Sequence, residues 1–222
     1  MNSQTRIEIR FGLIALALTG ALFTLGIAVR GPLARDNAAL MQAALSPQFV
    51  LGAVIGLTGG VLQIFGLLGL YRYLTNQRTS VIALLGVVFS VVGIVFVLPL
   101  ATFLAVNVPV IAELYQQGNQ EVIAVVESTF SGLGLALLGV SSVSGVIGAI
   151  VYAVALWRHG KPLRWMGAAW GLAGLMLSLS GPGLFITELL AAALMLVVGC
   201  ALARRGWQES GVEAGHKGVP AT

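Results

Sequence analysis

The stretch "VIALLGVVFSVVGIVFVLPLATFLAV", residues 81–106, runs for 26 residues without one charged side chain. An apolar run of roughly 18 or more residues with few charges is typical of a membrane-spanning helix. At about 1.5 Å of rise per residue, such a run is long enough for a hydrocarbon core of about 30 Å. This stretch therefore predicts a transmembrane helix.

Similar apolar segments occur along the rest of the chain, in which 58% of the 222 residues are hydrophobic and only 9% are charged. A soluble domain carries about 25% charged residues. Together with residues 81–106, the apolar segments are 11–29, 49–70, 131–157, 163–180 and 184–203. Lipid cannot satisfy backbone polar groups, so the segments should be helical. The sequence predicts an all-α integral membrane bundle of six transmembrane helices over residues 1–205, followed by a disordered cytoplasmic tail, residues 206–222.

The basic residues orient this bundle. With six crossings, ten of the twelve fall on one side of the membrane: Arg6, Arg10, Arg72, Arg78, Arg158, Lys161, Arg164, Arg204, Arg205 and Lys217. Only Arg30 and Arg35 fall on the other. The positive-inside rule then predicts cytoplasmic termini, in a multi-pass protein of the bacterial plasma (inner) membrane. Short basic clusters between apolar runs indicate orientation in a lipid bilayer and not a nucleic-acid partner. The alternative for residues 11–29, a cleaved signal peptide, is disfavoured by their length and by the lack of a small-x-small site.

The first and second outer connections have distinct patterns. Residues 30–49 predict a short helix on the membrane surface, capped by Asp36 or Asn37, and then a Ser46–Pro47 start to the next span. The second connection, about residues 107–130, contains three glutamates and no Lys or Arg. Its later part, 120–130, is apolar enough to extend the following transmembrane helix outward.

Small residues at four-residue spacing predict close helix packing. Gly52, Gly56 and Gly60 form one ladder, and a second ladder contains Ser141, Gly145, Ala149 and Ala153. Such ladders let backbones approach closely. We expect segments 49–70 and 131–157 to make one of the closest contacts, with a homodimer face as the alternative. Pro99 predicts a kink in residues 81–106.

Enzyme and cofactor chemistry finds no support in the sequence. The histidines, His159 and His216, lie in a loop and in the tail, so a transmembrane haem has no axial ligands. No predicted helix contains lysine for a retinal Schiff base, and no spacing resembles a metal site. The motifs HExxH and GxSxG are absent. We therefore expect a non-enzymatic protein with no cofactor and no bound metal.

A few polar groups inside the apolar segments are the candidates for function. Gln63 is expected to form a helix-to-helix hydrogen bond, with a ligand contact as the alternative. Ser141, Ser142 and Ser144 are expected to bond back to their own helix. Glu188 is an intramembrane carboxylate, and such groups are commonly functional. It also lies near a predicted helix N-terminus that favours negative charge.

Two readings of Glu188 stay open. It is an anchor or the ion-pair partner of Arg30 or Arg35, or it is a ligand or proton site. The leading function is a membrane module with an outward-facing polar pocket, formed by Glu127, Glu188, Arg30 and Arg35, that binds a small amphipathic ligand or a partner membrane protein. The alternative is a small secondary transporter or proton-coupled carrier that uses Glu188.

The stretches "KPLRWMGAAWGLAGLML" (161–177) and "ELLAAALMLVVG" (188–199) resemble an uncharacterised bacterial six-transmembrane-helix family, a domain of unknown function. In that family Arg-Trp opens the fifth helix, Trp-Gly-Leu-x-Gly follows, and a Glu begins the sixth. The matching positions here are Arg164-Trp165, residues 170–174 and Glu188. The spacing between the tryptophans is one residue longer here, and Val198 stands where a Lys is expected. The resemblance implies six helices and assigns no activity.

Overall fold

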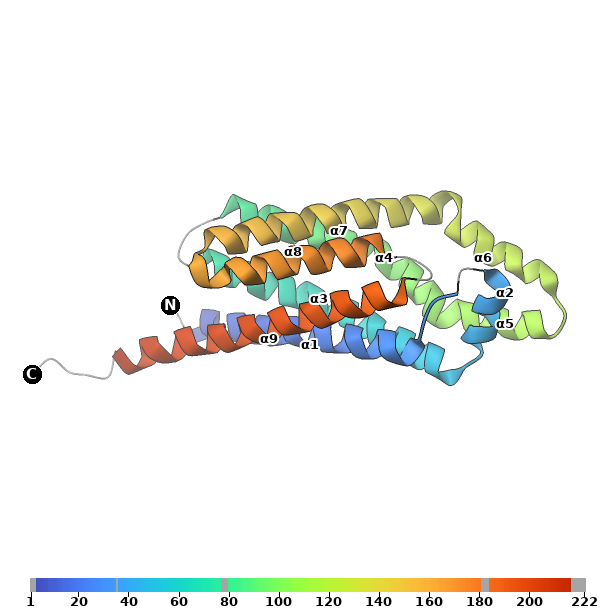
Figure 1. The fold of residues 1–222 in the computed structure, drawn as a ribbon, viewed down its shortest axis with the longest axis horizontal. Helices are drawn as coiled ribbons and strands as arrows, with labels where there is room; N and C mark the ends of the chain where they lie inside the picture. Colours follow the sequence, from blue (N-terminus) through green and yellow to red (C-terminus); the bar gives the residue numbers. More distant parts are fainter. Residues whose placement is uncertain (1–2, 35, 77–79, 181–183, 217–222) are drawn as a thin grey trace, which may run out of the picture.

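The described part of the chain is helical throughout its regular structure. The computed structural model describes residues 3–34, 36–76, 80–180 and 184–216, and these form nine α-helices and no strand (Figure 1). The α-helices are α1 (Ser3–Arg30), α2 (Asn37–Ala44), α3 (Pro47–Thr75), α4 (Val81–Thr102), α5 (Val108–Gln116), α6 (Ile123–Phe130), α7 (Gly132–Arg158), α8 (Arg164–Leu179) and α9 (Phe185–His216). Shorter pieces are a π-helix, Phe103–Asn107, and two 3₁₀ turns, Gln120–Val122 and Lys161–Leu163.

The long helices form a closed ring. Each packs chiefly against two others, and the order around the ring is α1, α3, α4, α7, α8, α9 and back to α1. The start of α1 and the end of α9 lie at the same end of the bundle, which we call the termini end (Figure 1). Helices α2, α5 and α6 gather at the opposite end, the cap end (Figure 1).

Five helical stretches of the described chain are long and apolar enough to cross a membrane. They are Gln4–Arg30, Pro47–Thr75, Val81–Gln116, Gly132–Arg158 and Phe185–Gln208. Large apolar side chains face outward from the ring, with Phe11 70% exposed and Leu133 77% exposed. Apolar surface on this scale indicates a membrane or a partner as its surroundings. The architecture is that of a helical multi-pass membrane protein.

The remaining predicted span, residues 163–180, corresponds to α8, which is shorter than the other ring helices. Its 16 residues rise by about 24 Å at 1.5 Å per residue. That length falls short of a hydrocarbon core of about 30 Å. In the ring, α8 nevertheless lies between α7 and α9 and contacts both.

The predicted close contact between segments 49–70 and 131–157 is wrong, because α3 and α7 are not neighbours in the ring. The glycine ladder of α3 has no single partner helix: a Cβ on Gly52 would overlap the backbone of Arg30 in α1, one on Gly56 would meet nothing within 4 Å, and one on Gly60 would lie 3.5 Å from Leu98 of α4. The ladder of α7 faces α4 and α8. A Cβ on Gly93 of α4 would lie 3.0 Å from the backbone nitrogen of Gly145. Small residues therefore permit close packing, as predicted, but they do not determine which helix packs against them.

Helices α2, α5 and α6 form a small cap with its own apolar cluster. The buried members of the cluster are Leu40, Met41, Ala44, Phe49, Val108, Ile111, Ala112 and Val126. The predicted start signals are confirmed. Asp36 caps α2 by accepting a hydrogen bond from the backbone N–H of Ala39 (2.8 Å). Ser46 likewise caps α3 ahead of Pro47. The apolar face of α2 contacts α5, so α2 is packed within the cap and does not lie with that face on a membrane surface as predicted.

The second outer connection is helical on both sides of its turn. The segment after α4 continues through the π-helix into α5, and Pro99 lies inside α4 four residues before this change. The predicted outward extension of the 131–157 helix is instead a separate helix, α6. It ends where Ser131 is extended and Gly132 adopts a φ of 47°, a conformation that favours glycine.

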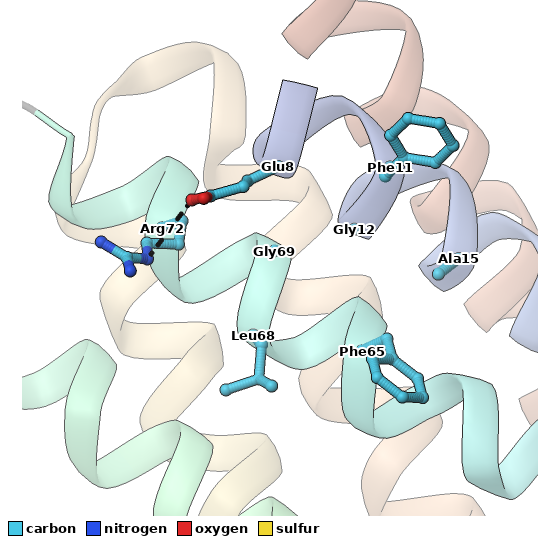
Figure 2. A pocket seen from close by; sticks show the side chains of 8 residues that line it. All are labelled: Glu8, Phe11, Gly12, Ala15, Phe65, Leu68, Gly69 and Arg72. Carbon is cyan, nitrogen blue, oxygen red and sulfur yellow. Dashed lines mark ion pairs between the residues drawn. The ribbon is translucent and has the colours of Figure 1, made fainter. Parts of the chain in front are cut away.

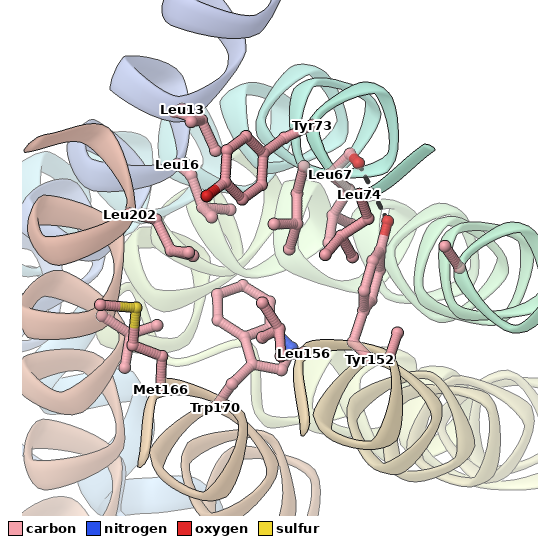
Figure 3. Packing of buried hydrophobic residues seen from close by; sticks show 14 of the residues in the cluster. Leu13, Leu16, Leu67, Tyr73, Leu74, Tyr152, Leu156, Met166, Trp170 and Leu202 are labelled. Atoms are coloured by element: carbon pink, nitrogen blue, oxygen red, sulfur yellow. Dashed lines mark hydrogen bonds between the residues drawn. The ribbon is translucent and has the colours of Figure 1, made fainter. Parts of the chain in front are cut away.

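The termini-end half of the ring is filled by side chains (Figure 3). Buried residues from the ring helices meet there, including Leu16, Leu67, Tyr152, Trp170 and Leu202. The Tyr152 hydroxyl donates a hydrogen bond to the Leu67 carbonyl oxygen (2.9 Å), which joins α7 to α3 across the interior (Figure 3). This packing fills the termini end, and the cavity inside the ring extends from the cap end to about the middle of the helices.

The predicted boundary between a bundle, residues 1–205, and a disordered tail, 206–222, does not coincide with a helix end. Helix α9 continues to His216, so the first part of the predicted tail is helical. Residues 217–222 lie outside the described residues.

Candidate functional site

An ion pair joins two helix ends at the cap end of the ring. Arg30 is the last residue of α1, and Glu188 lies in the first turn of α9. The Arg30 Nη2 donates to the Glu188 Oε2 at 2.7 Å, and the two side chains are only 17% and 13% exposed. A helix C-terminus favours a cation and a helix N-terminus favours an anion. Each charge is therefore stabilised by its own helix as well as by its partner.

A cavity of about 370 Å³ lies inside the ring beside this ion pair. All six ring helices contribute to its wall, and most of its lining is apolar, with Phe23, Phe49, Leu98 and Leu177 among the larger side chains. Arg30 and Glu188 line the cavity at the cap end, and Trp170 and Met195 line it where the packed core begins. Its volume is within the range of about 300–1,000 Å³ that is common for small-molecule pockets.

Five polar side chains line the cavity on the termini side of the ion pair, and we call them the polar belt. They are Gln63 from α3, Ser90 from α4, Ser141 and Ser142 from α7, and Ser178 from α8. Ser141 donates its hydroxyl to the Gly93 carbonyl oxygen of α4 (2.7 Å), so the predicted bond back to its own helix is wrong for this residue. A Cβ on Gly145 would lie 2.9 Å from the Ser178 Oγ, and one on Gly148 would overlap Ser90. These contacts bring the serines of α4, α7 and α8 to neighbouring levels of the ring.

Gln63 lies in the same layer. A Cβ on Gly60 would lie 3.5 Å from Leu98 of α4. Helices α3 and α4 are antiparallel, so at about 1.5 Å per residue Gln63 is about 4.5 Å, Gly93 about 7.5 Å and Ser90 about 12 Å closer to the termini end than that contact. Gln63 makes no hydrogen bond to another helix within the described chain, so the predicted helix-to-helix bond is not seen. Its amide lines the cavity instead.

The structure divides the predicted outward-facing pocket. Arg30 and Glu188 meet, as one reading of Glu188 required, and both line the cavity. Glu127 belongs to the cap, where its Oε1 accepts a hydrogen bond from the Asn37 Nδ2 (3.0 Å), and it does not line the cavity. Arg35 lies outside the described residues.

A second hollow lies on the outside of the ring, between α1 and α3 at the termini end (Figure 2). It has a volume of about 440 Å³. The exposed rings of Phe11 and Phe65 flank it, and Gly12 and Gly69 form its base. Glu8 and Arg72 lie at one end, with 4.0 Å between the Arg72 Nε and the Glu8 Oε2 (Figure 2). This shallow surface has few polar groups, so the internal cavity is the stronger candidate site.

Several cavity residues were missed by sequence reasoning. Ser90 and Ser178 were not singled out, and neither was Trp170 as a wall residue. The signal available for Ser90 was that it is the one polar side chain in the first twenty residues of α4. For Ser178 the signal was absent, because small hydroxyls near helix ends are common. For Trp170, in the middle of α8, the sequence does not show which face of the helix is turned toward the interior of the ring.

The described residues hold no group of three or more His, Cys, Asp or Glu side chains that could bind a metal ion. What the cavity offers is one ion pair, several hydroxyls, one carboxamide and apolar walls. Among the described lining residues, these groups can donate and accept hydrogen bonds and present one pair of opposite charges. The site and the fold together define a helical bundle of the multi-pass membrane type with a cavity inside its ring of helices. No protein family, curated protein or solved structure matches this chain.

Proposed function

We propose that this chain is a non-enzymatic, six-span protein of the bacterial plasma membrane, with cytoplasmic termini, that binds a small amphipathic molecule in the ring cavity. The observation that carries the proposal is the cavity itself: an ion pair at its cap end, and an apolar interior that ends at a packed core. An amphipathic molecule matches this arrangement, with its polar end at Arg30 and Glu188 and its apolar part in the cavity interior toward the packed core.

The ion pair favours a headgroup without net charge. Arg30 and Glu188 neutralise each other, so the pair attracts neither sign of charge over a distance. A zwitterionic headgroup satisfies both side chains when it separates them. A singly charged headgroup leaves one of them without a partner, and an uncompensated charge out of water is costly.

The shape of the cavity favours one hydrocarbon chain. Gly52 packs against Arg30, and Gln63 follows eleven residues later on α3, which is about 16 Å along the helix. A volume of about 370 Å³ spread over that depth is narrow. A single-chain zwitterionic amphiphile, such as a lysophosphatidylcholine with a dodecanoyl chain, fits this description.

Trp170 provides a direct test of binding, because it lines the inner end of the cavity and is 4% exposed. The variant Trp157→Phe/Trp165→Phe/Trp207→Phe keeps Trp170 alone. In lipid nanodiscs, ω-bromododecanoyl lysophosphatidylcholine is expected to quench Trp170 fluorescence saturably. Replacing both charges, Arg30→Gln/Glu188→Gln, is expected to weaken binding about tenfold, the equivalent of one charge-assisted hydrogen bond.

The matched control keeps Trp157 alone, since this side chain is 51% exposed on the outer surface. The fluorescence of Trp157 should show only the unsaturable quenching that comes from brominated amphiphile dissolved in the lipid. If Trp170 behaves in the same way as Trp157, no amphiphile enters the cavity and the proposal is wrong.

Reporter fusions test the number of spans and their orientation. Fusions after Arg205 and within residues 74–77 are expected to report cytoplasm, and a fusion at Gln117 the outside. If α8 does not cross the membrane, the Arg205 fusion moves to the side opposite residues 74–77. That result would replace six spans by five.

A further inference from the structure

The polar belt differs from the other hydroxyls of the helices in how its side chains are used. Thr19, Thr58 and Thr102 each donate to the carbonyl four residues earlier, the usual way for a hydroxyl to be satisfied inside an apolar helix. Ser90, Ser142 and Ser178 make no such bond, and within the described chain they have no other hydrogen-bond partner. The Gln63 side chain likewise has no hydrogen-bond partner within the described chain.

These groups are therefore free to bond to whatever fills the cavity. All four line it, and their side chains are only partly accessible. None of their polar atoms is among the buried side-chain atoms without a hydrogen-bond partner, so these atoms stay accessible from the cavity. Ser90 and Ser178 pack against glycines of α7, but within the described chain only Ser141 of the belt uses its hydroxyl for a hydrogen bond between two helices. The four groups come from four different helices, α3, α4, α7 and α8, and all of them line the cavity. This arrangement indicates recognition of a polar group inside the cavity.

We propose that the polar belt selects a ligand whose chain carries a hydroxyl or carbonyl group about 16 Å from its headgroup, which is the rise along α3 from Gly52, where the backbone of Arg30 packs, to Gln63. This inference rests on the proposed function and names the ligand class more closely. Gln63 offers both a donor and an acceptor, and each serine offers a hydroxyl that can do either. The belt is therefore suited to either group. An unsubstituted hydrocarbon chain leaves the whole belt unpaired.

The test compares two ligands that differ only at the end of the chain, dodecanoyl and ω-hydroxydodecanoyl lysophosphatidylcholine. Each competes with the ω-bromododecanoyl probe for the Trp170 site in nanodiscs. The measured quantity is the ratio of the two dissociation constants, in the protein with Trp170 alone and in the same protein carrying Gln63→Met. Differences in partitioning between water and lipid affect both proteins equally and cancel when the two ratios are compared.

We expect the hydroxylated ligand to bind about tenfold more tightly than the plain one in the parent protein. In Gln63→Met this preference should fall to about threefold or less, and adding Ser90→Ala and Ser178→Ala should abolish it. Methionine matches the length of glutamine, and continued binding of the plain ligand shows that the variant is folded. The control is Thr58→Val, an exposed hydroxyl on α3 that bonds within its own helix, which should leave the preference unchanged.

The outcomes separate the inference from the proposed function. If both ligands bind the parent equally and Gln63→Met changes nothing, the belt holds only water and the inference is wrong, while the proposed function stands. If neither ligand displaces the probe and the probe itself does not bind saturably, the proposed function fails and the inference fails with it.

Discussion

Glu188→Ala is expected to lower the free energy of unfolding by about 2–3 kcal/mol, because it leaves Arg30 without its partner in a site that is mostly removed from water. The loss is smaller than that for a fully buried pair, since the Arg30 side chain keeps 17% exposure. Glu188→Gln should cost less, because glutamine still accepts a hydrogen bond from the guanidinium. The measurement is chemical unfolding in mixed micelles, followed by circular dichroism.

Second substitutions identify the cause of that loss. Arg30→Gln/Glu188→Gln removes both charges and should recover part of the stability lost in Glu188→Ala. The exchange Arg30→Glu/Glu188→Arg should not, because it places an anion at the C-terminus of α1 and a cation at the N-terminus of α9. The control is Glu113→Ala, an exposed carboxylate of the cap. If Glu188→Ala is as stable as Glu113→Ala, the ion pair is not a stabilising contact.

The same variants address the carrier alternative. A proton-coupled carrier that uses Glu188 would show pH-gradient-driven flux in liposomes that Glu188→Gln lacks. We expect no such flux in the wild type, since the carboxylate is held by Arg30 and the packed core around Tyr152 and Trp170 closes the cavity toward the termini end. Flux that disappears in Glu188→Gln would favour the carrier over the binding protein.

Local features of the fold could be predicted from the sequence because their causes are local. The long helices follow from apolar runs, and the starts of α2 and α3 follow from Asp36 and from Ser46 with Pro47. The order of helices in the ring could not be predicted in this way. Gly52, Gly56 and Gly60 allow any backbone to approach, and which one does depends on the packing of all six helices together.

The candidate site was predicted in part for the same reason. The charges of Arg30 and Glu188 stood out in apolar surroundings, and few opposite charges were available, so their pairing was one of few choices. Glu127 had the same charge and an outer position, but Asn37 in the cap provides its partner. The belt was not predicted as a unit, since its members come from four helices and their common depth exists only in the folded ring.

Gly69→Ala is expected to have the largest effect on stability of the substitutions considered, a loss of about 3 kcal/mol or more. Gly69 of α3 and Gly12 of α1 meet backbone to backbone at the base of the outer hollow (Figure 2). A Cβ on either residue would overlap the Cα of the other. Backbone atoms cannot turn aside as a side chain can, so the helices must separate. That movement would weaken the whole α1–α3 contact.

The control for this prediction is Gly139→Ala in α7, where an added Cβ meets nothing within 4 Å. There alanine should be neutral or stabilising by about 0.5–1 kcal/mol, because glycine is the poorer helix former. Gly12→Ala should be as harmful as Gly69→Ala, and the double variant should cost less than the sum of the two, since both substitutions break one contact. Unfolding of the four variants under the same conditions provides the comparison. If Gly69→Ala is as stable as Gly139→Ala, α1 and α3 do not cross at these glycines, and the ring order that places α1 between α3 and α9 is wrong.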